Sequence, residues 1–236
     1  MAKDYFAGPV AERYDSTLGE WGDPEVVAAT ADFLAELAGD GAALELAIGT
    51  GRIALPLAAR GVPVHGIDLS EDMVAQLRAK PGGAEIPVTI GDFATTRVGE
   101  GFSLAYLVFN TIGNLTTQDV QVACFENAAA QLAPGGCFVV EVGVSAREPL
   151  RVFALSDTHV GIDEYDAATQ RLVSHHFSLV DAQWELRSIP FRAVSPAELD
   201  LMARLADLRL RERWSGWKRE PFTAESRRHV SVWEKL

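Results

Sequence analysis

The sequence predicts an α/β protein with a doubly wound, Rossmann-like, mostly parallel seven-stranded sheet and an antiparallel hairpin insertion after the fifth strand. Two observations lead to this fold class. As far as residue 144, short apolar runs alternate with amphipathic segments, and strands separated by helices pair in parallel through right-handed crossovers. Over 150–194, extended segments follow one another with no helix between them, which predicts antiparallel pairing.

Caps and turns place the elements of the parallel part. Asp23 is a side-chain acceptor directly before Pro24, a combination that begins a helix, and Gly39 ends that helix. Ser70 caps another helix, and Pro134-Gly135-Gly136 turns into the fifth strand. The apolar spacing predicts further helices at 52–59, 71–80 and 117–132, and strands at 43–47, 62–67, 87–90, 103–109 and 137–144.

The second part of the chain reads as hairpins followed by one helix and two closing strands. Ser195-Pro196-Ala197-Glu198 is a capping box that begins a helix ending near residue 206. We interpret 1–236 as a single domain, with an N-terminal lid and helix over 1–38 and an antiparallel β insertion over 150–194. The expected strands of this part are 151–154, 159–164, 172–179, 184–193, 208–214 and 229–234.

Composition and charge exclude several classes of protein. The formal net charge of the 236 residues is −12, which repels phosphate backbones, so we expect no nucleic-acid partner. Basic residues near the C-terminus are interleaved with acidic ones, which favours a solvated face with ion pairs over an anion-binding patch. Cys124 and Cys137 lie in apolar stretches and indicate neither a disulfide framework nor a metal site. With no membrane-spanning run, the sequence predicts a cytoplasmic protein without a membrane partner.

The most informative segment is the loop after the first strand, Leu46-Ala47-Ile48-Gly49-Thr50-Gly51-Arg52. Gly49 and Gly51 permit a positive φ and leave no Cβ between the backbone and a ligand. The free N–H groups of the following helix then face that ligand. A Gly-x-Gly turn in this context indicates a nucleotide cofactor, but by itself it is a weak signal.

Two further strand ends strengthen the cofactor hypothesis. Asp68 ends the second strand, where a carboxylate can hold a ribose diol, and Asp92-Phe93 follows the third strand, where an acid and an aromatic ring suit an adenine. The carboxyl ends of parallel strands meet at one edge of a sheet, where ligands bind. The alternative is that both acids are ordinary loop or N-cap residues.

These segments resemble class I S-adenosylmethionine (SAM)-dependent methyltransferases of the small-molecule type. The resemblance is carried by Glu45 to Gly51, Asp68 in GIDLS, Asp92-Phe93 in GDF, and Pro134-Gly135-Gly136. Ala47 departs from the glycine usual in that family, at the cost of one methyl group. The resemblance implies SAM as cofactor and S-adenosylhomocysteine (SAH) as product. It implies these cofactor-binding residues: Tyr14, Glu45, Ala47, Gly49, Thr50, Gly51, Arg52, Asp68, Leu69, Met73, Asp92, Phe93, Phe109 and Asn110.

The resemblance implies that Glu45 and the backbone of 47–51 hold the methionine end of SAM. It implies that Asp68 holds the ribose and that Asp92 and Phe93 hold the adenine. The implied reaction transfers the sulfonium methyl to N, O or C of a small-molecule acceptor, as in secondary metabolism. Some aminosugar N-methyltransferases share this layout, but that is an analogy alone. The sequence does not distinguish a monomer from a homodimer.

The acceptor side is less clearly marked. We expect Trp21 and Asn114 to contact the substrate, while the catalytic residues stay unknown, with Tyr14, Asn114 and His176 as weak candidates. His175 and His176 are adjacent on a strand and point to opposite faces, so one of them at most enters a pocket. No set of side chains has metal-ligand spacing. Loop shaping is the alternative role for Asn114, and a surface aromatic anchor on the lid is the alternative for Tyr14 and Trp21.

Two rival functions stay open at this point. An NAD(P)-dependent oxidoreductase also needs glycines and an acid after the second strand. It would, however, leave Gly91-Asp92-Phe93 and Pro134-Gly135-Gly136 unexplained. A SAM-binding protein without catalysis is the second rival.

Overall fold

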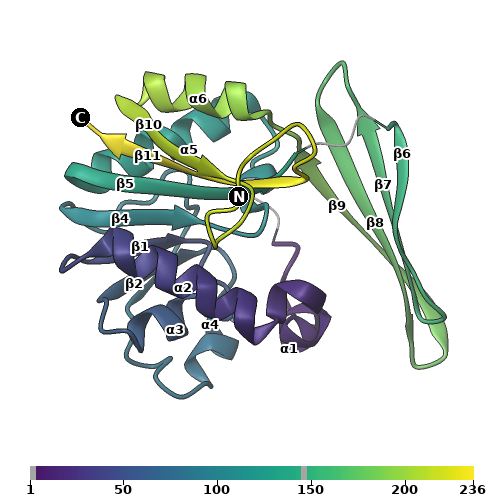
Figure 1. Ribbon diagram of the computed structural model, residues 1–236. Helices are drawn as coiled ribbons and strands as arrows, with labels where there is room; N and C mark the ends of the chain where they lie inside the picture. Colours follow the sequence, from purple (N-terminus) through teal and green to yellow (C-terminus); the bar gives the residue numbers. More distant parts are fainter. Residues whose placement is uncertain (1–3, 145–147) are drawn as a thin grey trace.

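A seven-stranded sheet forms the centre of the computed structural model, which describes residues 4–144 and 148–236 (Figure 1). The strand order is β10-β11-β5-β4-β1-β2-β3, with β11 antiparallel to both neighbours and the other pairings parallel. The strands are β1 (Ala43–Leu46), β2 (Val64–Asp68), β3 (Val88–Ile90), β4 (Phe102–Leu107), β5 (Leu132–Gly143), β10 (Leu208–Trp214) and β11 (Arg228–Lys235). The predicted fold class is confirmed.

Helices cover both faces of this sheet, because successive strand residues point to opposite sides. Leu104 and Tyr106 of β4 pack with Leu34 of α2 (Pro24–Ala38) in one apolar cluster, which also includes residues of α3 (Ala54–Ala58) and α4 (Glu71–Arg78). Ala105 and Leu107 belong to the cluster on the other face, under α5 (Gln118–Gln131) and α6 (Pro196–Leu205). The core therefore consists of two apolar layers separated by the sheet.

Short helices carry the N-terminal segment over one edge of the core. They are α1 (Pro9–Arg13), η1 (Asp15–Thr17) and η2 (Gly19–Gly22), and η3 (Thr111–Asn114) follows β4. Within the described residues, no helix has both the length and the apolar character needed to cross a membrane.

A second, four-stranded antiparallel sheet stands apart from the first, at the side where α1 also lies (Figure 1). Its strands are β6 (Leu150–Leu155), β7 (His159–Asp166), β8 (Arg171–Val180) and β9 (Gln183–Arg192), in that order. Asp181 and Ala182, both with positive φ, make the tight turn between β8 and β9. We refer to β6–β9 as the hairpin sheet.

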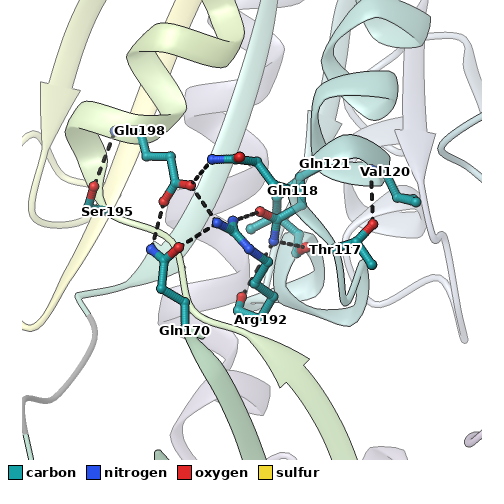
Figure 2. A network of polar contacts seen from close by, with 9 residues as sticks. Thr117, Gln118, Val120, Gln121, Gln170, Arg192, Ser195 and Glu198 are labelled. Carbon is teal, nitrogen blue, oxygen red and sulfur yellow. Dashed lines mark hydrogen bonds and ion pairs between the residues drawn. The ribbon is translucent and has the colours of Figure 1, made fainter. Parts of the chain in front are cut away.

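A buried ion pair with amide partners ties the end of the hairpin sheet to the core (Figure 2). The Arg192 guanidinium at the end of β9 donates to Glu198 Oε1 at 2.6 Å, at the beginning of α6. It also donates to the side chains of Gln170, before β8, and Gln121 on α5. Gln118 Nε2 donates to Glu198 at 2.6 Å. The beginning of α5, the residue before β8, the end of β9 and the beginning of α6 thus meet at one guanidinium.

The element boundaries differ from the predicted ones by a few residues. The largest difference is at the fifth strand, which begins at Leu132 and not at 137. Leu132 is extended and pairs with Phe102, and the ladder shifts register before Leu104, so the Pro-Gly-Gly turn lies inside the strand. The third helix begins at Ala54, because residues 49–53 continue the turn that Gly49 and Gly51 make with positive φ.

Candidate active site

The loop after β1 has the backbone conformation that its glycines suggested. Gly49 has φ of 56° and Gly51 of 76°. A Cβ on Gly51 would lie 2.2 Å from Leu77 Cδ1, so that position requires glycine. Ala47 adopts φ of 58°, which costs an L-residue about 1 kcal/mol. The loop therefore keeps its shape even where alanine replaces the smaller residue.

Asp68 connects this loop to the next strand. Its Oδ2 accepts the Gly49 N–H at 2.6 Å and its Oδ1 accepts the Ser70 N–H at 2.8 Å. Burial raises the pKa of the Asp68 carboxyl, and these two N–H groups oppose that rise. Each carboxylate oxygen has a second acceptor site. The residue therefore has a loop-shaping role and also faces the adjoining cavity.

Asp92 and Phe93 are held in a comparable way after β3. Asp92 Oδ1 accepts the Ala94 N–H at 2.9 Å. Asn127 of α5 donates to the Phe93 carbonyl at 3.0 Å and fixes the backbone of this turn. These bonds place both side chains against the same cavity as Asp68.

A cavity of about 310 Å³, here called the loop cavity, opens at these strand ends. That volume is in the range of small-ligand sites. Nine of the predicted site residues line it: Tyr14, Ala47, Gly49, Asp68, Leu69, Met73, Asp92, Phe93 and Asn114. The cavity also has walls that the sequence reasoning missed, namely Asp4, Tyr5 and Phe6 from the N-terminal segment and Ile189 and Pro190 from β9.

Glu45 is buried near the end of β1 and lines neither the loop cavity nor any other cavity described here. Its Oε2 accepts the Tyr106 hydroxyl at 2.8 Å, and the residue is 3% exposed. Burial raises the pKa of Glu45 to about 8, while the Tyr106 hydrogen bond and the nearby Arg52 charge lower it. A carboxyl with this pKa loses its proton near neutral pH when a cation binds beside it.

Thr50 and Arg52 contact the N-terminal segment and do not line either cavity. Thr50 Oγ1 donates to Asp15 Oδ1 at 2.6 Å, and Lys80 forms an ion pair with the same carboxylate at 2.5 Å. Arg52 Nη1 donates to the Trp21 carbonyl at 3.0 Å. Residues 4–22 are thereby fastened over the loop cavity, and the Tyr14 hydroxyl, buried there, has its pKa raised to about 12.

A second cavity of about 380 Å³, here called the hairpin cavity, lies between the core and the hairpin sheet. Trp21 and Phe109 line it with their rings 5.0 Å apart, together with Asn110. Segment 109–114 borders both cavities, since Phe109, Asn110 and Gly113 face this one while Thr111 and Asn114 face the loop cavity. The two cavities therefore meet at the carboxyl end of β4.

The hairpin sheet contributes a polar wall to this second cavity. His176 lines it, whereas His175 points to the opposite face, where its Nδ1 lies 2.8 Å from Ser188 Oγ. The prediction that one of the two histidines at most enters a pocket is confirmed. The sequence reasoning missed Glu148, Arg151, Asp163, Tyr165 and Ser174, which also line the cavity.

The other histidines have structural surroundings. His65 on β2 lies 3.1 Å from the Thr89 hydroxyl, and burial lowers its pKa. His229 on β11 is fully buried with its Nδ1 2.8 Å from Ser231 Oγ. Neither residue lines the loop cavity or the hairpin cavity.

Comparison with known proteins identifies the family. Residues 43–136 match the family model described as a methyltransferase domain. The structure of the CcbJ methyltransferase from Streptomyces caelestis is 36% identical, with a TM-score of 0.88 over 99% of this chain and 100% of that one. The chain belongs to the SAM-dependent methyltransferases. In this family SAM is the cofactor, so the protein is a methyl-transferring enzyme and not an oxidoreductase.

Two further relatives of this methyltransferase have named acceptors. Cypemycin N-terminal methyltransferase from a Streptomyces species is 26% identical over 81% of this chain and 82% of its own. A Streptomyces fradiae enzyme, dTDP-3-amino-3,6-dideoxy-α-D-glucopyranose N,N-dimethyltransferase, is 34% identical over 58% of this chain and 54% of its own. The first name specifies methylation at an N-terminus, and the second specifies N,N-dimethylation of an amino sugar.

Proposed function

We propose that this methyltransferase transfers the methyl group of SAM to an amino nitrogen of a small-molecule acceptor of secondary metabolism. The single observation that carries the proposal is the pair of cavities that meet at segment 109–114. One has the cofactor-loop residues in its wall, and the other has a polar wall from the hairpin sheet. A methyl donor in the first and an acceptor in the second would meet at the end of β4.

In this proposal the loop cavity holds SAM. Asp68 would bind the ribose hydroxyls through the free acceptor sites of its oxygens, and Asp92 and Phe93 would bind and cover the adenine. The SAM carboxylate and ammonium would lie by the 47–51 backbone and Glu45, whose burial leaves it ready to ionise opposite a cation. Thr50 and Arg52 would not contact the cofactor; they would hold the N-terminal segment in place over it.

The hairpin cavity suits an amine. Among the described residues in its wall, Glu148 and Asp163 are acidic, while the Arg192 guanidinium is already paired with Glu198. Arg151 is a third charge and lies near Asp163; burial raises the pKa of the Asp163 carboxyl, while the Ser174 hydroxyl and the Arg151 charge oppose that rise. One acid in excess favours a cationic or amine-bearing ligand. The two relatives named above, which methylate nitrogen, support the same acceptor class.

Positioning and desolvation would supply most of the catalysis, because the sulfonium methyl is already activated. Trp21 and Phe109 would exclude water from the transfer point, and Asn110 and Asn114 would orient the nucleophile.

We also propose that the protein works in the cytoplasm, as one domain, and as a monomer or homodimer without nucleic-acid or membrane partners.

The test is a transfer assay with matched acceptors. Purified protein and SAM are incubated with dTDP-3-amino-3,6-dideoxyglucose, or with the analogue that carries a hydroxyl in place of the amine, and SAH and methylated product are measured by mass spectrometry. We expect SAH and an N-methyl product with the amine alone. Equal SAH formation from the hydroxyl analogue, or SAM binding with no transfer to this amine or to a wider panel of amino sugars and aminoacyl peptides, would contradict the proposal.

A further inference from the structure

A continuous row of polar side chains crosses β7 and β8 on the face of the hairpin sheet that lines the hairpin cavity. Asp163 of β7 is directly opposite Ser174 of β8, and the Ser174 hydroxyl opposes the rise that burial causes in the pKa of the Asp163 carboxyl. Ser174 Oγ lies 3.3 Å from His176 Nε2, and His176 Nδ1 lies 3.2 Å from His159 Nε2. The four side chains, here called the β7–β8 relay, form one continuous row of polar groups.

The two ends of the relay are in different surroundings. Asp163, Ser174 and His176 line the hairpin cavity, and Ser174 is 7% exposed. His159 is the first residue of β7; it is half-buried and does not line the cavity. Its ring stacks on that of His176 with the centroids 5.4 Å apart and the planes at 18°. The relay therefore leads from the interior of the cavity to the beginning of the strand.

The relay holds His176 as a neutral imidazole. Burial lowers the pKa of His176 to about 4, and the neighbouring Arg187, His159 and His175 lower it further. Arg187 is opposite His176 on β9, while the Phe153 ring of β6 covers it at 5.4 Å between centroids. A neutral imidazole has one N–H donor and one bare nitrogen acceptor. A hydroxyl is likewise both donor and acceptor, so every bond of the chain can reverse its direction.

We propose that the β7–β8 relay removes the proton that an amine acceptor loses, with Asp163 as the group that receives it from the acceptor and His159 as the exit to solvent. The inference rests on the proposed transfer to nitrogen. In that role Asp163 is the catalytic residue, while Ser174, His176 and His159 are positioning residues that act through it.

The protons balance in this scheme. The bound acceptor ammonium gives one proton to the Asp163 carboxylate, which leaves the nitrogen lone pair free to attack the SAM methyl; the carbon–sulfur bond breaks and its electron pair stays on sulfur. Protonated Asp163 no longer accepts from Ser174, so both imidazoles exchange through water from the Nε2–H to the Nδ1–H form, with no net change in their protons. Asp163 then donates to Ser174 Oγ, Ser174 to His176 Nε2, and His176 Nδ1–H to His159 Nε2. The Nδ1 proton of His159 passes to water. Asp163 is then an anion again, and every hydrogen bond of the relay points toward it.

The first experiment needs no acceptor. Long-range ¹H–¹⁵N NMR of the imidazole rings in the SAH complex at pH 7 reads the tautomer of each histidine. With Asp163 ionised, Ser174 donates to it, so His176 and His159 should each be in the single Nε2–H form. In Asp163→Ala, Ser174 is released and we expect a mixture of tautomers at His176. His175→Gln, adjacent but on the opposite face, is the matched control and should leave the tautomers unchanged. A wild-type His176 in the Nδ1–H form, or no change in Asp163→Ala, would overturn the relay.

The second experiment measures kcat against pH with dTDP-3-amino-3,6-dideoxyglucose. Removing an acid–base group costs about 100-fold, so Asp163→Ala, Ser174→Ala and His176→Ala should lose up to that factor at pH 6.5. They should regain it as rising pH deprotonates the amine without help, with SAM binding unchanged. A loss of equal size at every pH would indicate a merely structural role and contradict the relay. Absence of turnover in the wild-type protein would instead count against the proposed function, while the NMR result still decides the relay.

Discussion

At the residue scale, Glu45 links the cofactor loop to the chemistry of binding. In the free protein its pKa of about 8, raised by burial, leaves the carboxyl mostly protonated at pH 7. A SAM ammonium beside it would lower that pKa and drive off the proton. We therefore expect SAM binding at pH 7 to release up to one proton, and SAM affinity to rise with pH up to about 8. Titration calorimetry in buffers of different ionisation enthalpy measures this release.

The pKa of Glu45 also predicts how the free energy of unfolding depends on pH. Because the pKa of Glu45 is higher in the folded protein than its ordinary value of 4.5, the folded state holds more protons between pH 4.5 and about 8. The free energy of unfolding then falls as pH rises through that window. Glu45→Gln should remove this slope in thermal melts without ligand while abolishing SAM-induced stabilisation. A Glu45→Gln protein that is still stabilised by SAM would show that Glu45 does not face the cofactor.

At the scale of elements, the Arg192–Glu198 pair decides where the hairpin sheet sits. Arg192 is 6% exposed and joins β9 to α5 and α6 (Figure 2). Removing one partner of a buried pair costs about 3–5 kcal/mol, so we expect Arg192→Ala to lower the free energy of unfolding by about that amount in urea titrations. The double variant Arg192→Met/Glu198→Leu should recover most of the loss, because neither charge is left unpaired. A loss below about 1 kcal/mol in the single variant would show that the network does not anchor the sheet.

Sequence patterns predicted the elements better than their assembly into a site. The loop cavity is formed by the ends of consecutive parallel strands, so Gly49, Asp68 and Asp92 could be brought together from topology alone. The hairpin cavity depends on how antiparallel strands pair across turns and on the tilt that the Arg192 network gives them. Asp163 and Ser174 are distant in the sequence and adjacent only through that register, and no periodic signal marks them. Two aromatic residues of β9 show the same limit: Trp184 is 53% exposed on the opposite face, while Phe191 lines the cavity.

At the scale of the whole molecule, the proposed function gives the enzyme a cofactor half and an acceptor half. The first sheet with its loops would hold SAM and the hairpin sheet would hold the acceptor. The N-terminal segment is fastened across the cofactor loop by Asp15 and Arg52. Segment 109–114 borders both cavities, and so does β9, whose Ile189 and Pro190 line the loop cavity while Phe191 lines the hairpin cavity. Asp68 and Asp163 are outside these shared segments, so a change at either one should leave ligand binding in the other cavity nearly intact.

The most direct test is a calorimetric titration of SAH into three proteins: wild type, Asp68→Asn and Asp163→Ala, with NADH as a parallel titrant. Asn at 68 keeps one oxygen for the loop but loses the charge that would bind the ribose hydroxyls. The account predicts one SAH site in the wild type, affinity within about twofold in Asp163→Ala, a loss of roughly 10-fold or more in Asp68→Asn, and no heat from NADH. Loss of SAH binding in Asp163→Ala with Asp68→Asn unaffected, or binding of NADH in its place, would contradict it.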